Sequence, residues 1–340
     1  MLEFPNRNPF TMSGPWSYRL RSLLTFFRAA LTVSVRRALH GPQRPNWTWN
    51  FEVITSFARA QAIAAFEISD PVASRAYENV LVPYSPALAQ INVRLVEGPV
   101  QGHWYTPKVG HRAVTLLYLH GGGYVYYADL YHSLISEVAL ATEANTFALD
   151  YRLSPEHPFP AQLEDAVAAY RWLLEQGVAP DRLVVAGDSA GGNLTLTLLL
   201  ALRDARLPLP ALAVGISPWT DVGDRGASMT TNEETDWIQK RMAIQWGKWL
   251  CNGADPTNPL ISPIYGDWRN LPPVYIQAGD AEVLYDMIRE FVALAQAQGA
   301  DVTLDVWPHM NHDFQAFGEA APDSALAFAR LREVVRQHVT

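Results

Sequence analysis

The residue with the clearest potential for chemistry is Ser189, in the run Gly187-Asp-Ser-Ala-Gly-Gly192. An apolar strand pattern leads into this run, and the helical pattern 193–203 follows it. Gly-x-Ser-x-Gly between a strand and a helix is typical of a strained turn that exposes the serine hydroxyl as a nucleophile. The bare pattern also occurs in structural turns, but the flanking strand and helix favour a nucleophile.

A second pattern could stabilise negative charge on a reacting oxygen. An apolar strand pattern ends in His120 and three consecutive glycines, Gly121, Gly122 and Gly123. Without a Cβ, such a loop can bring backbone N–H groups close to a substrate and form an oxyanion hole. We expect Gly122 and Gly123 to donate, with the amide of Ala190 as a third donor. The loop lacks the Lys and Ser/Thr of a phosphate-binding P-loop, and we expect His120 to be structural.

A serine nucleophile needs a base and an acid, and several residues near the end of the chain could serve. His309 and His312 follow the last strand pattern, while Asp280, Glu282 and Asp286 follow the strand before it. The chain order serine, acid, histidine is that of α/β-hydrolases. The residues alone leave the acid open.

Taken together, the motifs resemble the hormone-sensitive-lipase-like branch of the α/β-hydrolases, also called bacterial family IV esterases, over about residues 75–340. The marks of the resemblance are His120–Gly123, Asp150–Pro160, Gly187–Gly192, Leu271–Val274 and the His312 region. His312 matches the family's His-x-Phe position. The family usually has Asp-Pro-Leu-x-Asp where this chain has Glu-Val-Leu-Tyr-Asp, which aligns Glu282 with the catalytic acid and leaves Asp280 as the alternative. For Asp286 we expect a capping role on the next helix.

The resemblance implies a carboxylic-ester hydrolase that acts on short to medium acyl chains without a metal or an organic cofactor. Aromatic residues suggest a pocket for hydrophobic or cyclic esters, with Tyr124, Tyr126 and Trp219 as candidate contacts. A lactonase, deacetylase or amidase would use the same triad. A catalytically silent receptor for a small ligand is the alternative from another class, but it would need the loss of a triad member.

The elements expected to position these residues alternate between strands and helices from about residue 77 onward. Helical patterns fall at about 131–143, 160–177, 191–204, 283–299 and 323–338. Strand patterns fall at Asn79–Val82, Ile91–Glu97, Val114–His120, Thr146–Tyr151, Leu183–Gly187, Ala211–Ser217, Val274–Gly279 and Val302–Trp307. This alternation predicts an α/β-hydrolase fold with a mainly parallel central sheet of about eight strands and helices on both faces. The first two strands, with no helix between them, should form an antiparallel edge.

The alternation of strand and helix patterns stops after residue 218, and about fifty residues that are rich in tryptophan follow. We therefore expect residues 219–264 to be a cap insertion and residues 1–75 to be the N-terminal part of the same helical cap. Residues 76–218 and 265–340 would form the catalytic core.

A basic amphipathic helix is predicted near the N-terminus. Its apolar positions are Leu24, Phe27, Leu31 and Val35, and its basic positions are Arg21, Arg28 and Arg36. It could cover the active site, which we favour, or lie on a membrane surface. The apolar run is interrupted by Arg28 and is too short to span a bilayer.

Composition excludes several classes of protein. The net charge is −8 over 340 residues, which argues against a general nucleic-acid binder because phosphate contacts need clustered Lys and Arg. A single cysteine, Cys251, excludes an intramolecular disulfide and a cysteine metal cluster. We expect a cytoplasmic enzyme with a small-molecule ester substrate, and the sequence leaves a homodimer and a peripheral membrane contact of the N-terminal helix open.

Overall fold

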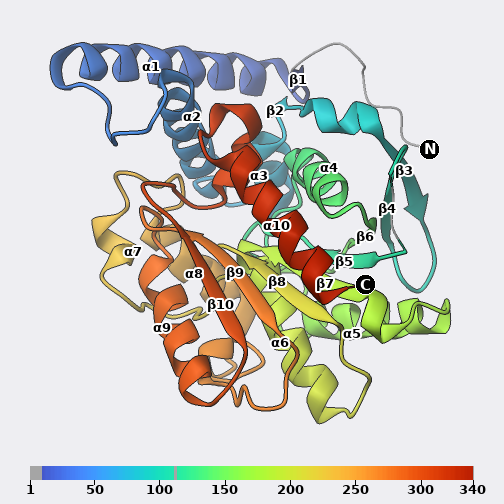
Figure 1. Cartoon of the computed structure of the whole chain (residues 1–340). Helices are drawn as coiled ribbons and strands as arrows, with labels where there is room; N and C mark the ends of the chain where they lie inside the picture. The colour runs from blue at the N-terminus through green and yellow to red at the C-terminus, as the bar shows by residue number, and fades with distance from the viewer. Residues whose placement is uncertain (1–9, 111–112, 340) are drawn as a thin grey trace.

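The computed structural model describes residues 10–110 and 113–339 and is built around one large twisted sheet (Figure 1). Its eight strands lie in the spatial order β10 (Val302–Trp307), β9 (Val274–Gly279), β8 (Leu212–Ile216), β7 (Leu183–Asp188), β5 (Thr115–Leu119), β6 (Asn145–Leu149), β4 (Gly102–Pro107) and β3 (Ile91–Val96). The six strands from β10 to β6 run parallel, and β4 pairs antiparallel with both of its neighbours, β6 and β3. The expected mainly parallel sheet is confirmed.

The edge of the sheet differs from the prediction. The antiparallel edge consists of β3 and β4, whereas β2 (Leu81–Pro83) leaves this sheet and pairs with β1 (Phe10–Met12). The sequence pattern missed β4, because its residues Gly-His-Trp-Tyr-Thr-Pro include a glycine and a proline that are uncommon in strands. Our pairing of the first two strand patterns was therefore wrong.

Helices cover both faces of the sheet, as strands with near-continuous apolar sequences require. Side chains of β5 alternate between the faces, so Leu117 and Leu119 contribute to one apolar core while Leu116 and Tyr118 contribute to the other. Helices α5 (Ala161–Glu175), α6 (Ser189–Asp204) and α9 (Tyr285–Ala297) supply buried residues to the first core. Helices α4 (Leu130–Thr142) and α10 (Ser324–His338) supply them to the second core.

Further helices lie beyond the carboxyl ends of the parallel strands. From the N-terminal segment come α1 (Trp16–His40), α2 (Trp49–Phe66) and α3 (Pro71–Glu78), and from the segment after β8 come α7 (Ser228–Thr231) and α8 (Lys240–Cys251). Short 3-10 turns occupy Pro86–Gln90, Pro180–Arg182, Pro263–Tyr265 and Phe314–Ala320. Within the part of the chain that is described, no helix has both the length and the apolar character that crossing a bilayer requires.

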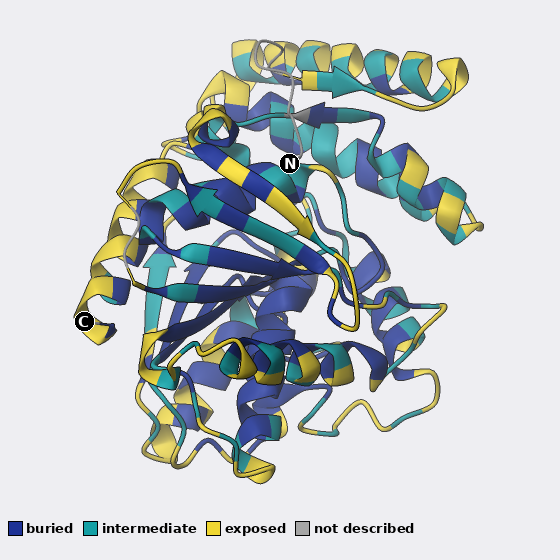
Figure 2. Cartoon of the chain, turned by 90° about the vertical axis from the view of Figure 1, so that its right-hand side faces the viewer, coloured by how far each residue is buried: buried dark blue, intermediate teal, exposed yellow. Residues whose placement is uncertain are grey.

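Helix α1 forms the outermost layer and packs on α2 (Figures 1 and 2). It buries a face of small residues, Ser22, Ala29 and Val33, which allows the two helices to approach closely. The apolar residues that we expected to cover the active site, Leu24, Phe27, Leu31 and Val35, are exposed instead. The outward side of α1 is yellow at the top of Figure 2. Periodicity predicted the helix correctly, but it could not tell which of two apolar faces packs on the protein.

Candidate active site

The candidate nucleophile sits in the turn between β7 and α6. Ser189 has a positive φ of 51°, a strained conformation for a residue other than glycine. The turn needs close backbone approach, because a Cβ on Gly191 would lie 1.9 Å from the carbonyl oxygen of Leu119. The first amides of α6 have no partner within the helix and favour negative charge nearby. The expected turn between strand and helix is therefore present, with Ser189 buried in the wall of a cavity.

His312 and Glu282 converge on this serine from the loops after β10 and β9. Nε2 of His312 lies 2.9 Å from Oγ of Ser189, and Nδ1 lies 3.4 Å from Oε2 of Glu282. The first distance is a hydrogen bond, whereas the second is slightly longer than the 2.6–3.2 Å range expected of one. All three side chains are buried. The carboxyl ends of neighbouring strands thus bring together a hydroxyl, an imidazole and a carboxyl group from three distant parts of the chain.

The alternative residues of the sequence lie elsewhere. Oδ1 of Asp280 accepts a hydrogen bond of 2.6 Å from the backbone N–H of His309, and Oδ2 of Asp286 accepts one of 2.9 Å from Ser228. Asp286 lies inside the first turn of α9 and not at the capping position before it. The side chain near Ser189 is that of His312, with Glu282 on its far side.

Burial shifts the ionisation of the pair that flanks Ser189. Loss of hydration lowers the pKa of His312 below its usual value, and it raises the pKa of Glu282 to about 8, an effect that the hydroxyl of Ser217 partly offsets. His312 is consequently a neutral imidazole at neutral pH, the form that can accept a proton from a serine hydroxyl.

A second carboxyl group, Asp313, contacts the same histidine. Its Oδ2 lies 3.2 Å from Nε2 of His312, on the side of Ser189. Asp188 is close by and accepts a hydrogen bond of 2.6 Å from the hydroxyl of Tyr118. Burial raises the pKa of Asp188 to about 6, and burial together with the neighbouring Asp188 raises the pKa of Asp313 well above its usual range. Asp313 contacts the ring nitrogen that faces Ser189 and not Nδ1, so it does not take the place of Glu282 on the far side of the imidazole.

The glycine loop after β5 lies beside Ser189. Gly122 has a φ of 93°, and a Cβ there would lie 2.2 Å from the carbonyl oxygen of Tyr126, so the loop needs glycine at this position. Gly122 and Gly123 both line the cavity that contains Ser189. The amide of Gly121 already donates a hydrogen bond of 3.1 Å to Asp188, so it is occupied within the protein.

His120 is packed as a structural residue would be. Its ring is stacked between those of Tyr127 and Tyr151, with centroid distances of 4.0 and 4.1 Å. Nδ1 lies 2.8 Å from the carbonyl oxygen of Gly121, and burial lowers the pKa of His120 to about 4. The ring thus holds the glycine loop as a neutral group.

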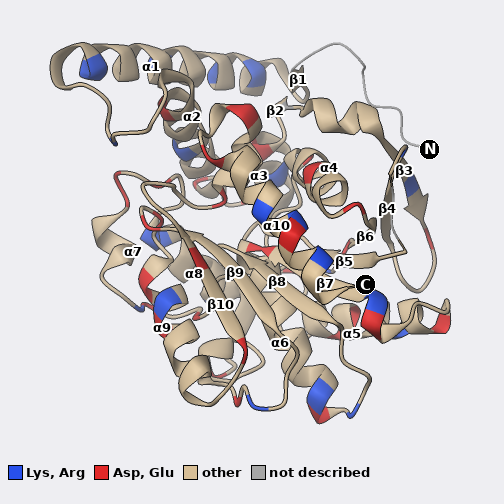
Figure 3. Cartoon of the chain, viewed as in Figure 1, with Lys and Arg blue, Asp and Glu red and all other residues tan. Residues whose placement is uncertain are grey.

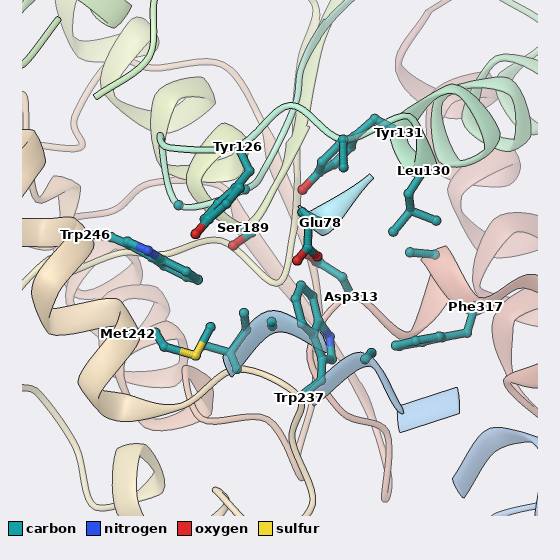
Figure 4. A pocket seen from close by; sticks show the side chains of 17 residues that line it. Glu78, Tyr126, Leu130, Tyr131, Ser189, Trp237, Met242, Trp246, Asp313 and Phe317 are labelled. Atoms are coloured by element: carbon teal, nitrogen blue, oxygen red, sulfur yellow. The ribbon is translucent and has the colours of Figure 1, made fainter. Parts of the chain in front are cut away.

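A cavity opens onto Ser189 (Figure 4). Most of its wall is apolar, and Glu78 and Asp313 point their carboxyl groups toward its centre in Figure 4. The lining consists of Ala58, Ala62, Glu78, Gly122, Gly123, Tyr126, Ala128, Leu130, Tyr131, Ser189, Trp237, Ile238, Met242, Trp246, Asp313, Ala316 and Phe317. Residues of α2, α3 and α8 thus close the space above the serine.

The expected substrate contacts are only partly found in this wall. Tyr126 lines the cavity, but Tyr124 and Trp219 do not. The hydroxyl of Tyr124 donates to Asn193 at 2.6 Å. Trp219 is buried beside the turn between β7 and α6, where its backbone N–H donates to the carbonyl oxygen of Ser189 at 3.0 Å. A contact of either residue with a substrate therefore stays a prediction that the wall of this cavity does not support. In the described residues no cluster of three or more His, Cys, Asp or Glu side chains could hold a metal ion.

The sequence analysis missed Asp236, which connects the segment after β8 to the candidate acid and base. One carboxylate oxygen accepts from the backbone N–H of His312 at 3.3 Å and the other from that of Val283 at 2.7 Å. The indole of Trp237 donates to His312 O at 2.8 Å. The backbone of Asp236 itself accepts from Arg59 of α2 at 2.6 Å. No local pattern marks these residues, because their partners are distant in sequence.

The geometry can be compared with known proteins. Residues 116–316 match a family model described as alpha/beta hydrolase fold. The chain belongs to the α/β-hydrolase family. A crystal structure of an esterase from the bacterial hormone-sensitive lipase family is 32% identical, with a TM-score of 0.73, and the match covers 96% of this chain and 100% of that one.

Curated relatives agree with this assignment. An acetyl-hydrolase of Streptomyces hygroscopicus is 46% identical over 219 residues, which cover 63% of this chain and 72% of that protein. An ethyl acetate hydrolase of Pseudomonas putida is 32% identical over 233 residues, which cover 66% and 73% of the two chains. The predicted fold, the resemblance to hormone-sensitive-lipase-like esterases and the reaction class, ester hydrolysis by an enzyme, are confirmed.

Proposed function

We propose that Ser189, His312 and Glu282 form a catalytic triad that hydrolyses carboxylic esters through an acyl-enzyme. The observation that carries this proposal is the 2.9 Å contact between Nε2 of His312 and Oγ of Ser189, in a turn that opens onto an apolar cavity. The carboxyl group of Glu282 lies on the opposite ring nitrogen, where it can hold the imidazole in orientation. Positive charge that forms on the ring during the reaction favours the ionised form of Glu282, which then stabilises the imidazolium.

The reaction has two halves. Oγ of Ser189 attacks the ester carbonyl as His312 takes its proton, and the resulting oxyanion accepts hydrogen bonds from the amides of Gly122, Gly123 and Ala190. His312 then gives the proton to the leaving alcohol as the carbon–oxygen bond breaks. Water adds to the acyl-enzyme in the same way, with its proton passing through His312, and the acid leaves.

The experiment that tests this mechanism is a pre-steady-state measurement with p-nitrophenyl acetate. We expect a burst of p-nitrophenol equal to the enzyme concentration, or an acetylated species in intact-mass spectra of a reaction quenched with acid. Ser189→Ala should show neither and should lose turnover while its circular dichroism spectrum stays unchanged. Turnover within tenfold of the wild type in this variant would contradict the proposed nucleophile.

For the substrate we propose short to medium or cyclic hydrophobic esters, because the cavity wall is mostly apolar. We assign residues 1–75 and 219–264 to a helical cap over a core of residues 76–218 and 265–340, since α2 and α8 supply part of the wall. A panel of acyl lengths, lactones and amides would separate an esterase from a lactonase, deacetylase or amidase. We place the enzyme in the cytoplasm, which fractionation of the producing cells would test.

A further inference from the structure

Helix α1 carries an unusual surface on its outward side. A stripe of seven large apolar residues runs along its length, each between 44% and 73% exposed. These residues are Trp16, Leu20, Leu24, Phe27, Leu31, Val35 and Leu39. At three- and four-residue spacing they share one face of a helix whose 25 residues extend over about 37 Å. An unpartnered apolar face of this length marks an interaction site, because single exposed apolar residues are normal but a contiguous row is not.

The charged residues of the same helix are all basic. It contains five arginines and no acidic residue, although the whole chain has a net charge of −8 (Figure 3). Arg36 and Arg37 form ion pairs with Glu52 of α2. Arg21 and Arg28 have no ion pair among the described residues, although the guanidinium of Arg21 also lies over the ring of Tyr77, 5.2 Å from its centroid. Each precedes an apolar residue of the stripe by three positions, so both flank it.

We propose that this face of α1, the apolar stripe with Arg21 and Arg28 beside it, docks the enzyme on an anionic lipid bilayer. The apolar residues would enter the boundary between headgroups and acyl chains while the guanidinium groups bind lipid phosphates. The remaining surface is acidic in sum and is repelled by an anionic bilayer, so the charge distribution selects one orientation.

A second copy of the chain fits this face less well. Two stripes packed against each other would bring two basic helices together without an acidic residue on either one. Like charges across such an interface oppose association. The charge pattern therefore favours lipid over a helix-to-helix dimer, and the dimer becomes an outcome of the test.

Docking through α1 would also place the active site close to the lipid. Helix α2 packs against α1 and supplies Ala58 and Ala62 to the wall of the catalytic cavity. The cavity therefore lies one helix layer away from the proposed docking face. This relation rests on the proposed ester hydrolysis, but the docking itself does not.

The test is flotation of the full chain with vesicles of phosphatidylcholine alone or with about 30% phosphatidylglycerol. We expect binding to the anionic vesicles, weaker binding to the neutral ones, and release of much of the protein at about 0.5 M NaCl, where charge interactions are screened. Equal binding to both vesicle types, or no binding to either, would overturn the proposal.

Two variants assign the contacts. The triple variant Leu24→Gln, Phe27→Gln and Leu31→Gln should abolish flotation, whereas Val109→Gln, a matched change of an exposed apolar residue outside α1, should not. If the triple variant floats as well as the wild type, the stripe does not bind lipid. The double variant Arg21→Gln and Arg28→Gln should lower the binding constant about 30-fold and reduce its salt dependence.

A soluble substrate keeps this result separate from the enzymatic proposal. All of these variants should hydrolyse p-nitrophenyl acetate at the wild-type rate in the absence of vesicles, because none of the changed side chains lines the cavity. Sedimentation velocity completes the test. A wild-type dimer that the triple variant converts to a monomer, with no vesicle binding by either protein, would show that a second copy covers the stripe.

Discussion

The carboxyl group of Glu78 allows a prediction about the cost of placing a charge in the catalytic cavity. Glu78 ends α3 and points into a mostly apolar wall, and its Oε2 is buried without a hydrogen-bond partner among the described residues. Burial raises the pKa of Glu78 to about 7 from the ordinary 4.5. We expect Glu78→Gln to stabilise the protein at pH 8 and to have little effect at pH 5.

The sign and the size follow from linkage. In the unfolded chain the carboxyl group ionises near pH 4.5, whereas in the folded protein it stays neutral until about pH 7. The folded state is therefore penalised increasingly from pH 4.5 to 7, and by a constant amount above that, about 3 kcal/mol if the group were fully shielded. The residue as a whole is only half-buried, so solvent screening reduces the expected difference to about 1–2 kcal/mol.

The assay is urea unfolding of the wild type and of Glu78→Gln at pH 5 and at pH 8. Other ionisable groups cancel in the difference between the two proteins. Glu175→Gln, a change of an exposed carboxylate at the end of α5, is the control and should not alter the pH dependence. A stability difference between the wild type and Glu78→Gln that is the same at both pH values would refute the reasoning. The KM for an apolar ester should likewise rise across pH 7 in the wild type alone.

The triad allows three further predictions. His312→Ala should reduce kcat by at least about 10⁴-fold, whereas His309→Ala should stay within tenfold of the wild type in the same assay. Glu282→Gln should reduce kcat by about 10²–10⁴-fold, because the imidazolium loses its counter-charge, and Asp280→Asn should cost far less; the reverse order would show that the alignment placed the wrong acid. A pH profile of kcat should fall on the acid side, with a midpoint below the 6.5 of an ordinary imidazole, because burial lowers the pKa of His312; a midpoint above 6.5 would contradict this.

The features that could be predicted from sequence depend on short, local patterns. The turn at Ser189 and the glycine loop at Gly122 are specified by residues that are adjacent in sequence, since small residues permit the backbone conformations found there. The buried strands β5 and β7 are also recognisable locally. Their near-continuous apolar runs are typical of strands that are covered on both faces of a parallel sheet.

What could not be predicted depends on contacts between distant segments. Glu78 and Asp236 are ordinary acids in the sequence, and only the packing of α3 and of the segment after β8 brings them to the site. Strand β2 pairs with β1 rather than with the sheet for a similarly long-range reason. The face of α1 that packs on α2 could not be predicted either. It carries small residues such as Ala29, which let the two helices approach closely, and a hydrophobicity pattern does not detect this.

The hydrogen bonds around Asp236 connect the segment that covers the cavity to the loops that carry the candidate acid and base. Asn232 donates to the backbone carbonyls of Asp280 and Glu282 at 3.1 and 2.9 Å, and Asp236 holds the amide of His312. The segment that roofs the cavity is thus also the scaffold of the loops that carry the acid and the base. Any displacement of this segment would break these hydrogen bonds, so the cover of the cavity and the positions of the candidate acid and base are coupled to each other.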